Sequence, residues 1–198
     1  MSKHVLVPVA DGSEDIEFSA ITDVLHRAEL NVTVASVMGR KNVTLAHGLK
    51  LESDSLIGEE SASKYDGVFL AGGFDGSNHF GKSEELKKFM HEMRDQKKLF
   101  GAICAAPVLS LGPLGMLEGV QRATCYPSME SMFPPTVKPS TDVVVKCGQC
   151  LTSRGPGTAI FFALAAVSVL RGKDVASAIA KALLVDHFPE AQLAISIA

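Results

Sequence analysis

Leu99-Phe100-Gly101-Ala102-Ile103-Cys104-Ala105-Ala106-Pro107 is the stretch that decides the fold of this 198-residue chain. Its first five residues form an apolar run long enough for one buried strand. The run stops at Cys104, and the small residues and Pro107 that follow predict that a helix begins directly after the cysteine. This order puts the sulfur on a sharp strand-to-helix turn, at the positive end of a helix, which favours the thiolate. The alternative is that Cys104 is a small buried hydrophobe, as most free cysteines are.

Similar apolar runs recur along the chain and alternate with helical patterns. The predicted strands are residues 5–9, 32–37, 68–71 and 99–103, and the predicted helices are residues 14–28, 83–97, 158–170 and 173–184. Gly172 is placed to end the third of these helices. Residues 43–51 and 143–151 resemble short hairpins added to the sheet. Alternating units of this kind predict a doubly wound α/β fold, in which helices cover both faces of a parallel sheet.

The composition indicates a soluble globular protein with one domain over residues 1–198, because 46% of the residues are hydrophobic and 21% are charged. The net charge is −3, and no Lys/Arg-rich run indicates binding to nucleic acid or an anionic membrane. The N-terminal strand lacks the features of a signal peptide, and the longest apolar stretch, residues 159–167, is too short to span a bilayer. Four cysteines without a framework spacing indicate a reducing compartment. We therefore expect a cytoplasmic protein.

Two further segments are expected to place functional groups at the edge of the sheet where Cys104 lies. Gly72 and Gly73 follow the strand at residues 68–71, and their N–H groups could hold an oxyanion, although a glycine pair is also common in plain turns. Glu17 lies on the apolar stripe of the first helix and is therefore expected to face the core. A buried acid beside a thiolate could donate a hydrogen bond to it and carry protons. The alternative is that Glu17, near the helix start, simply reaches solvent.

The other cysteines carry weaker signals. Cys147 and Cys150 have the spacing of redox and metal sites, but they fall at a predicted hairpin turn rather than at a helix start. No second Cys/His pair stands nearby to complete a zinc site, so no metal is expected. Cys125 is expected to be a packing residue.

Five motifs in this order resemble the ThiJ/PfpI superfamily, specifically the branch of the Parkinson-associated DJ-one protein and its bacterial relatives. They are residues 11–17 (DGSEDIE), 32–35 (VTVA), 71–73 (AGG), 102–107 (AICAAP) and 151–158 (LTSRGPGT), and the similarity runs from Val5 to about Val185. The resemblance implies a flavodoxin-like homodimer without a cofactor.

The resemblance also implies roles for particular residues. Cys104 would be the nucleophile, Glu17 its protonated partner, and the N–H groups of Gly73 and Ala105 the lining of an anion pocket. The residues expected to surround this centre are Gly72, Arg27, Tyr126 and Arg154, with Arg27 reaching the site across the dimer interface.

The chain departs from the superfamily at two positions. Tyr126 stands where some members of the branch have a histidine, and Ala105 stands where a PfpI-type peptidase has one. These departures argue against peptidase activity and leave Glu17 as the main acid/base candidate.

The resemblance implies a glyoxalase that converts methylglyoxal to lactate, or a deglycase that repairs glycated groups. The alternative is an oxidative-stress sensor or redox-regulated chaperone whose Cys104 is oxidised to a sulfinic acid. A cysteine hydrolase or amidotransferase is a minor alternative, because His187-Phe188-Pro189-Glu190 only approximates the triad end of the latter family.

Overall fold

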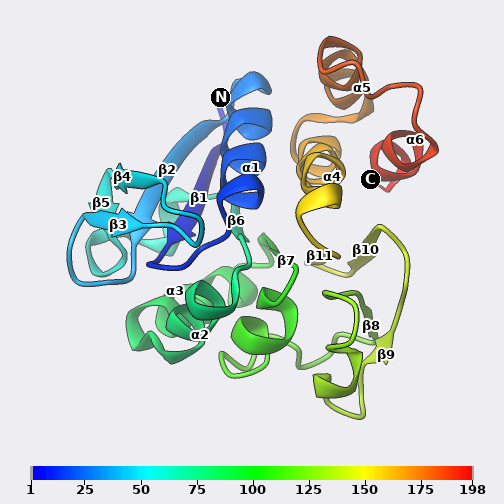
Figure 1. Cartoon of the computed structure of the whole chain (residues 1–198). Helices are drawn as coiled ribbons and strands as arrows, with labels where there is room; N and C mark the ends of the chain where they lie inside the picture. Colours follow the sequence, from blue (N-terminus) through cyan, green and yellow to red (C-terminus); the bar gives the residue numbers. More distant parts are fainter. Residues whose placement is uncertain (1, 198) are drawn as a thin grey trace.

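The computed structural model describes residues 2–197 and has a seven-stranded sheet between two layers of helices (Figure 1). The strand order is β10-β11-β7-β6-β1-β2-β5, and every pairing is parallel except that of β10 with β11. These strands are β1 (His4–Val9), β2 (Asn31–Ser36), β5 (Ser55–Leu56), β6 (Gly67–Leu70), β7 (Leu99–Ile103), β10 (Val144–Cys147) and β11 (Cys150–Ser153). The predicted flavodoxin-like α/β fold is confirmed.

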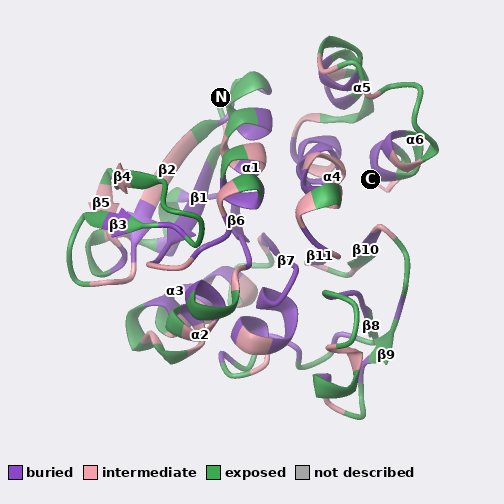
Figure 2. Cartoon of the chain, in the orientation of Figure 1, coloured by how far each residue is buried: buried purple, intermediate pink, exposed green. Residues whose placement is uncertain are grey.

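Two hydrophobic cores cover the two faces of the sheet. Along β1, Val5, Val7 and Val9 belong to one core, whereas Leu6 belongs to the other, as the alternation of side chains along a strand requires. The first core lies under α1 (Asp15–Arg27), α4 (Ala159–Arg171), α5 (Lys173–Ala182) and α6 (Pro189–Ser196). The second core lies under α2 (Phe74–Lys82), α3 (Glu84–Asp95) and the wide-turned helix η3 (Pro107–Leu111). The helices turn buried stripes toward the sheet and exposed stripes outward (Figure 2).

The remaining elements are short. They are the strands β3 (Asn42–Thr44), β4 (Lys50–Glu52), β8 (Arg122–Ala123) and β9 (Lys138–Pro139), and the 3-10 turns η1 (Ile57–Glu59), η2 (Ala62–Lys64), η4 (Glu130–Met132) and η5 (Pro156–Thr158). β3 and β4 form a separate two-stranded sheet, and β8 and β9 form another.

One predicted hairpin joins the sheet and the other does not. The hairpin at residues 143–151 forms β10 and β11 at one edge of the main sheet, as expected. The prediction that residues 43–51 also extend the sheet is wrong, because β5 occupies the edge beside β2. The β3–β4 hairpin is instead tied to the loop after β1, where Gly12 N–H donates to the Thr44 carbonyl at 2.9 Å and Asp11 accepts from Thr44 N–H at 2.9 Å.

Capping residues set the observed helix ends close to the predicted ones. Glu14 is the N-cap of α1 rather than its first residue, and Ser83 caps α3 by accepting from Leu86 N–H at 3.2 Å. Gly172 ends α4 with a φ of +93°, a conformation that glycine adopts at little cost. Within residues 2–197, no helix has both the length and the apolar character needed to cross a membrane.

Candidate functional site

Cys104 occupies the turn that follows β7 with a φ of +65°. A residue with a side chain rarely adopts this left-handed conformation, which persists only when its surroundings hold it. Here the Cys104 N–H donates to the Ser153 carbonyl at 3.1 Å, and the Cys104 carbonyl accepts from the Tyr126 N–H at 2.7 Å. The predicted sharp turn is therefore present, with its backbone fixed from two sides.

The chain after the cysteine differs from the expected regular helix. Pro107–Leu111 forms a single wide turn of π type, and only Ala105 and Ala106 separate it from Cys104. The Leu109 N–H donates to the Ala105 carbonyl at 2.9 Å. The helical turn thus begins two residues later than predicted, while the N–H of Ala105 still acts to lower the pKa of Cys104.

Gly72 and Gly73 bring the end of β6 against the cysteine. A Cβ atom at Gly72 would lie 2.5 Å from Cys104 Cβ and 2.7 Å from Glu17 Oε2, closer than real Cβ contacts come. Gly73 has a φ of +83° and is the N-cap of α2, and its N–H acts to lower the pKa of Cys104. The absence of a side chain at Gly72 is therefore what allows the glycine turn, the acid and the thiol to meet.

Glu17 lies on the buried stripe of α1 and is fully buried, as the sequence predicted. Its Oε2 accepts from the Gly72 N–H at 2.6 Å, while its Oε1 has no hydrogen-bond partner. Burial raises the pKa of Glu17 to about 7, against the opposing effects of the Gly72 N–H and of a hydrogen bond with the Cys104 thiol. A buried carboxyl oxygen without a partner is costly when charged, so this arrangement favours a protonated acid that faces the sulfur.

The thiol itself does not follow the expectation from the helix start. Burial, and then the charge and hydrogen bond of Glu17, raise the pKa of Cys104 to about 12, and the N–H groups of Gly73 and Ala105 act in the opposite direction. The prediction that the turn favours the thiolate is therefore wrong, because burial is the largest cause and outweighs the two N–H donors. When Glu17 holds the proton its charge disappears, and the two N–H donors are then opposed mainly by burial.

The sequence reasoning overlooked Glu14, which positions Glu17. Glu14 is buried at the N-cap of α1, where its Oε2 accepts from the Glu17 N–H at 2.8 Å and its own N–H donates to the Gly72 carbonyl at 3.1 Å. These two bonds fix the first turn of α1 against the glycine turn. The spacing of two acids three residues apart at a helix start, similar to a capping box, is the signal that could have identified it.

The side chains expected around this centre have different environments, as Tyr126, Arg154 and Arg27 show. Tyr126 is held to the Cys104 carbonyl through its backbone, and its ring covers Gly155 while remaining 46% exposed. Arg154 donates to the Thr141 carbonyl at 2.7 Å. Arg27 is exposed, pairs with Asp23 at 2.7 Å, and lies ten residues beyond Glu17, roughly 15 Å along α1. Within one chain Arg27 is therefore not brought to the thiol, and its role across a dimer interface stays a prediction.

The remaining candidates are Cys125, the segment at residues 187–190 and a metal site. All four cysteines are free, and Cys125 is buried. The segment at residues 187–190 starts α6, which packs on α4 and α5. Among residues 2–197, no group of three or more His, Cys, Asp and Glu side chains is arranged to hold a metal ion.

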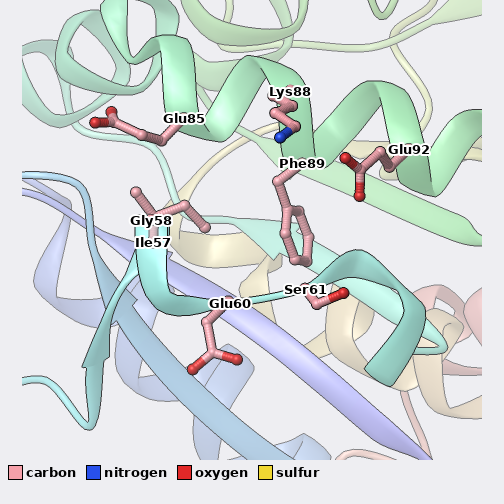
Figure 3. A pocket seen from close by; sticks show the side chains of 8 residues that line it. All are labelled: Ile57, Gly58, Glu60, Ser61, Glu85, Lys88, Phe89 and Glu92. Atoms are coloured by element: carbon pink, nitrogen blue, oxygen red, sulfur yellow. The ribbon is translucent and has the colours of Figure 1, made fainter.

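A hollow of about 310 Å³ lies between α3 and residues 57–61, which include η1, and none of its lining residues belongs to the Cys104 centre (Figure 3). Glu85 and Glu92 of α3 border it on one side and Glu60 on the other, with the ring of Phe89 between them. The Glu60 carboxylate is already occupied, because the Tyr65 hydroxyl donates to it at 2.6 Å. We therefore place the chemistry at Cys104 rather than in this hollow.

The strained cysteine, the buried acid and the glycine turn belong to a fold that comparison with known proteins identifies. The model of the DJ-1/PfpI family matches residues 3–169. The chain belongs to this family. Protein dj-1beta of Drosophila melanogaster is 39% identical over 188 residues, covering 94% of this chain and 100% of the relative. Protein DJ-1 homolog B of Arabidopsis thaliana is 40% identical over 182 residues, or 92% of this chain and 41% of the relative.

Solved structures agree with this assignment. The crystal structure of Drosophila melanogaster DJ-1beta has a TM-score of 0.88 at 38% identity, and covers 93% of this chain and 99% of that one. The structure of oxidized Toxoplasma gondii DJ-1 has a TM-score of 0.88 at 37% identity, and covers 92% of this chain and 98% of that one. The chain spans less than half the length of the two Arabidopsis relatives, at 41% and 48%.

Proposed function

We propose that this protein is a cofactor-independent glyoxalase that converts small dicarbonyls such as methylglyoxal to 2-hydroxy acids, and that acts on glycated groups by the same carbonyl chemistry. The observation that carries the proposal is the contact of a strained cysteine with a fully buried acid and two N–H donors. A Caenorhabditis elegans relative named glutathione-independent glyoxalase DJR-1.2 supports the reaction class. It is 30% identical over 183 residues, covering 92% of this chain and 95% of the relative.

Transfer of a proton from the Cys104 thiol to Glu17 produces the thiolate, which is the nucleophile. With Glu17 protonated, its O–H donates to the sulfur, and the N–H groups of Gly73 and Ala105 stabilise the thiolate without a charge being added to the site. The buried Glu17 carboxylate thus accepts the proton of the Cys104 thiol, so no histidine is needed as the base.

The reaction follows from these positions. The Cys104 thiolate adds to the aldehyde carbon, and the N–H groups of Gly73 and Ala105 hold the resulting oxyanion, which becomes a hemithioacetal on protonation. Glu17 in its ionised form removes the proton from this carbon and returns it to the neighbouring carbon, so that the ketone becomes the hydroxyl and the sulfur carries an acyl group. Water then hydrolyses this thioester, releases lactate and restores the thiol.

Lactate formation by a set of variants tests this proposal. We expect Cys104→Ala to abolish turnover and Glu17→Gln to reduce kcat by about 100-fold or more, because general acid–base catalysis contributes on the order of 10²–10⁴. Cys125→Ser is the matched control, since Cys125 is another buried free cysteine in the same molecule. Equal rates for the wild type and Cys104→Ala would refute the proposal.

A second candidate function is an oxidative-stress sensor or redox-regulated chaperone, in which Cys104 becomes a sulfinic acid. The related Toxoplasma gondii protein whose structure is described as oxidized favours this candidate. The N–H donors and the protonated Glu17 that stabilise a thiolate would also stabilise a sulfinate. Intact mass after mild peroxide treatment distinguishes the two functions, because a sensor gains two oxygen atoms at Cys104 and has negligible turnover, whereas the enzyme turns over while reduced.

We also propose that the protein works as a homodimer. Ile16, beside Glu17 at the start of α1, is 60% exposed, and Leu49 of the β3–β4 hairpin is 47% exposed. The two lie close together because Asp15 accepts from the Leu49 N–H at 3.1 Å. An apolar patch of this kind suits a second copy of the chain, and Arg27 on the same helix could then approach the partner's site.

A further inference from the structure

Cys147 and Cys150 face each other across the hairpin at the edge of the sheet. They are the last residue of β10 and the first of β11, and the antiparallel register pairs them directly. Only Gly148 and Gln149 separate them, and Gly148 has a φ of +58°, as two-residue hairpin turns with a leading glycine require. The spacing that the sequence shares with redox and metal sites is therefore an actual cross-strand pair.

The geometry of such a pair permits a disulfide. Side chains directly opposite each other lie on the same face of a sheet, with Cβ atoms roughly 4.5–5.5 Å apart. A disulfide needs Cβ atoms about 3.5–4.5 Å apart, so closing the bond requires the strands to approach slightly. The strain that this leaves makes the bond easy to reduce, and the very short loop that it closes adds little stability. A bond of this kind forms and breaks rather than serving as a permanent crosslink.

The two thiols differ in access, as a redox pair requires. Cys150 is 2% exposed, whereas Cys147 is partly exposed and its sulfur accepts from the Gln121 N–H at 3.4 Å. A hollow of about 250 Å³ is lined by both cysteines together with Arg94 and Glu118, so a small molecule can reach the pair. The turn is anchored, because Gln149 donates its amide to the Lys98 carbonyl at 3.1 Å.

This pair is separate from the Cys104 centre. In the parallel register of β11 with β7, Cys150 lies beside Phe100 and Ser153 lies beside Ile103. The pair therefore lies at the opposite end of β11 from the turn that holds Cys104, three residues or roughly 10 Å along the strand. A reaction at Cys147 and Cys150 therefore does not occupy the Cys104 centre.

We propose that Cys147 and Cys150 form a second redox site, a dithiol that exchanges with small-molecule disulfides. The Cys147 thiolate attacks one sulfur of the small disulfide, which breaks its S–S bond, releases one thiol and leaves a mixed disulfide on Cys147. The Cys150 thiol then loses its proton and attacks the Cys147 sulfur, which forms the intramolecular bond and releases the second thiol. Two protein thiols are oxidised and one small disulfide is reduced to two thiols, so atoms and electrons balance.

A resident metal fits this pair less well than disulfide exchange does. Two sulfurs fill half of a tetrahedral zinc shell. Among residues 2–197, no cluster of three or more metal-ligating side chains includes them.

Equilibration with oxidised glutathione, followed by alkylation of free thiols and peptide mass mapping, tests the proposal. A Cys104→Ala background removes oxidation at the other site. We expect the protein to lose the mass of two hydrogen atoms, to yield a linked Cys147–Cys150 peptide and to return to the dithiol in reduced glutathione. In the same background, Cys150→Ser is expected to stop at a stable glutathione adduct on Cys147.

Cys125→Ser in that background is the matched control and is expected to form the Cys147–Cys150 bond as readily. The proposal is overturned if the Cys104→Ala protein gains only glutathione adducts, or if Cys125 appears in the linked peptide. It is also overturned if the bond, once formed, resists reduced glutathione. Each outcome is read by mass and is independent of turnover at Cys104.

Discussion

The site joins three distant parts of the sequence, at Glu17, Gly72 and Cys104. Their contact depends on the absence of a Cβ atom at Gly72. A Cβ at Gly72 would lie 2.5 Å from Cys104 Cβ and 2.7 Å from Glu17 Oε2. We therefore expect Gly72→Ala to push the thiol and the acid apart, and a misplacement of about 1 Å can reduce kcat/KM by about 100-fold. Overpacking of this kind is also expected to lower the free energy of unfolding by about 1–3 kcal/mol.

Lactate formation and chemical denaturation measure the two effects of Gly72→Ala. Gly58→Ala is the control, because a Cβ at Gly58 would meet only Glu85 at an ordinary 3.7 Å. A Gly72→Ala protein with unchanged kcat/KM would show that the close approach is not needed for catalysis.

Stability is expected to depend on pH through Glu17. Its pKa is about 7 in the folded protein and 4.5 when unperturbed, so the folded state binds more protons between these values. The stability from this proton is fully present below about pH 4.5 and is lost as the pH rises toward 7. The shift corresponds to roughly 3 kcal/mol.

Denaturation of the wild type and Glu17→Gln at about pH 5 and about pH 8 tests this expectation. The glutamine cannot titrate, so the difference between the two pH values is expected to shrink by roughly 2.5 kcal/mol in the variant. Glu118→Gln is a suitable control, because the Glu118 side chain is 86% exposed. Equal pH dependence in the wild type and Glu17→Gln would contradict a raised pKa.

Residue patterns in the sequence predicted a buried Glu17 with a raised pKa but not the raised pKa of Cys104. The apolar periodicity around Glu17 was enough to place it in the core, since burial of that stripe follows from helix geometry. The pKa of Cys104 was predicted wrongly, because it is raised first by burial of the thiol and then by the charge of Glu17, and both depend on the assembled fold rather than on a local pattern. The spacing of Glu14 and Glu17 does predict a helix cap, but the bond of the Glu14 N–H to the glycine turn is non-local and could not be predicted from it.

At the scale of elements, long strands and helices were predictable and short ones were not. β7 was predicted with its observed bounds, and α3 lies within one to two residues of its predicted ends. β5 has only two residues, too few to show a periodic pattern. It forms an edge of the main sheet, to which the β3–β4 hairpin was expected to add. α2 was not predicted, because Gly76 and Gly81 obscure a helical pattern over its nine residues.

β11 supports the nucleophile turn through a side chain as well as its backbone. The buried Thr152 hydroxyl accepts from the Thr124 N–H at 3.0 Å, and two residues later the Tyr126 N–H binds Cys104. We expect Thr152→Val to leave a buried N–H without a partner and to lower the free energy of unfolding by about 1–3 kcal/mol. Thr141→Val, at an exposed position, is expected to change it by less than about 0.5 kcal/mol. Urea denaturation measures both, and equal stabilities would show that Thr152 is not needed for this support.

At the scale of the whole molecule, two apolar surfaces compete as the contact between copies. One is formed by Ile16 and Leu49 beside the Cys104 centre, and the other by Leu184 and Leu193, at 76% and 49% exposure, near α5 and α6. Only the first lies next to Glu17, so only a dimer through that surface would couple assembly to catalysis.

Sedimentation velocity with two charge substitutions decides between these surfaces. We expect Ile16→Lys to yield monomers with reduced turnover, because a lysine at the centre of an apolar contact must lose its hydration without gaining a partner. Leu193→Lys, the matched substitution on α6, is expected to leave both assembly and turnover unchanged. The reverse pattern would place the contact at the C-terminal helices, and a wild-type monomer would contradict the homodimer altogether. A monomer that retained full turnover would further show that Glu17 and Cys104 need nothing from a second copy.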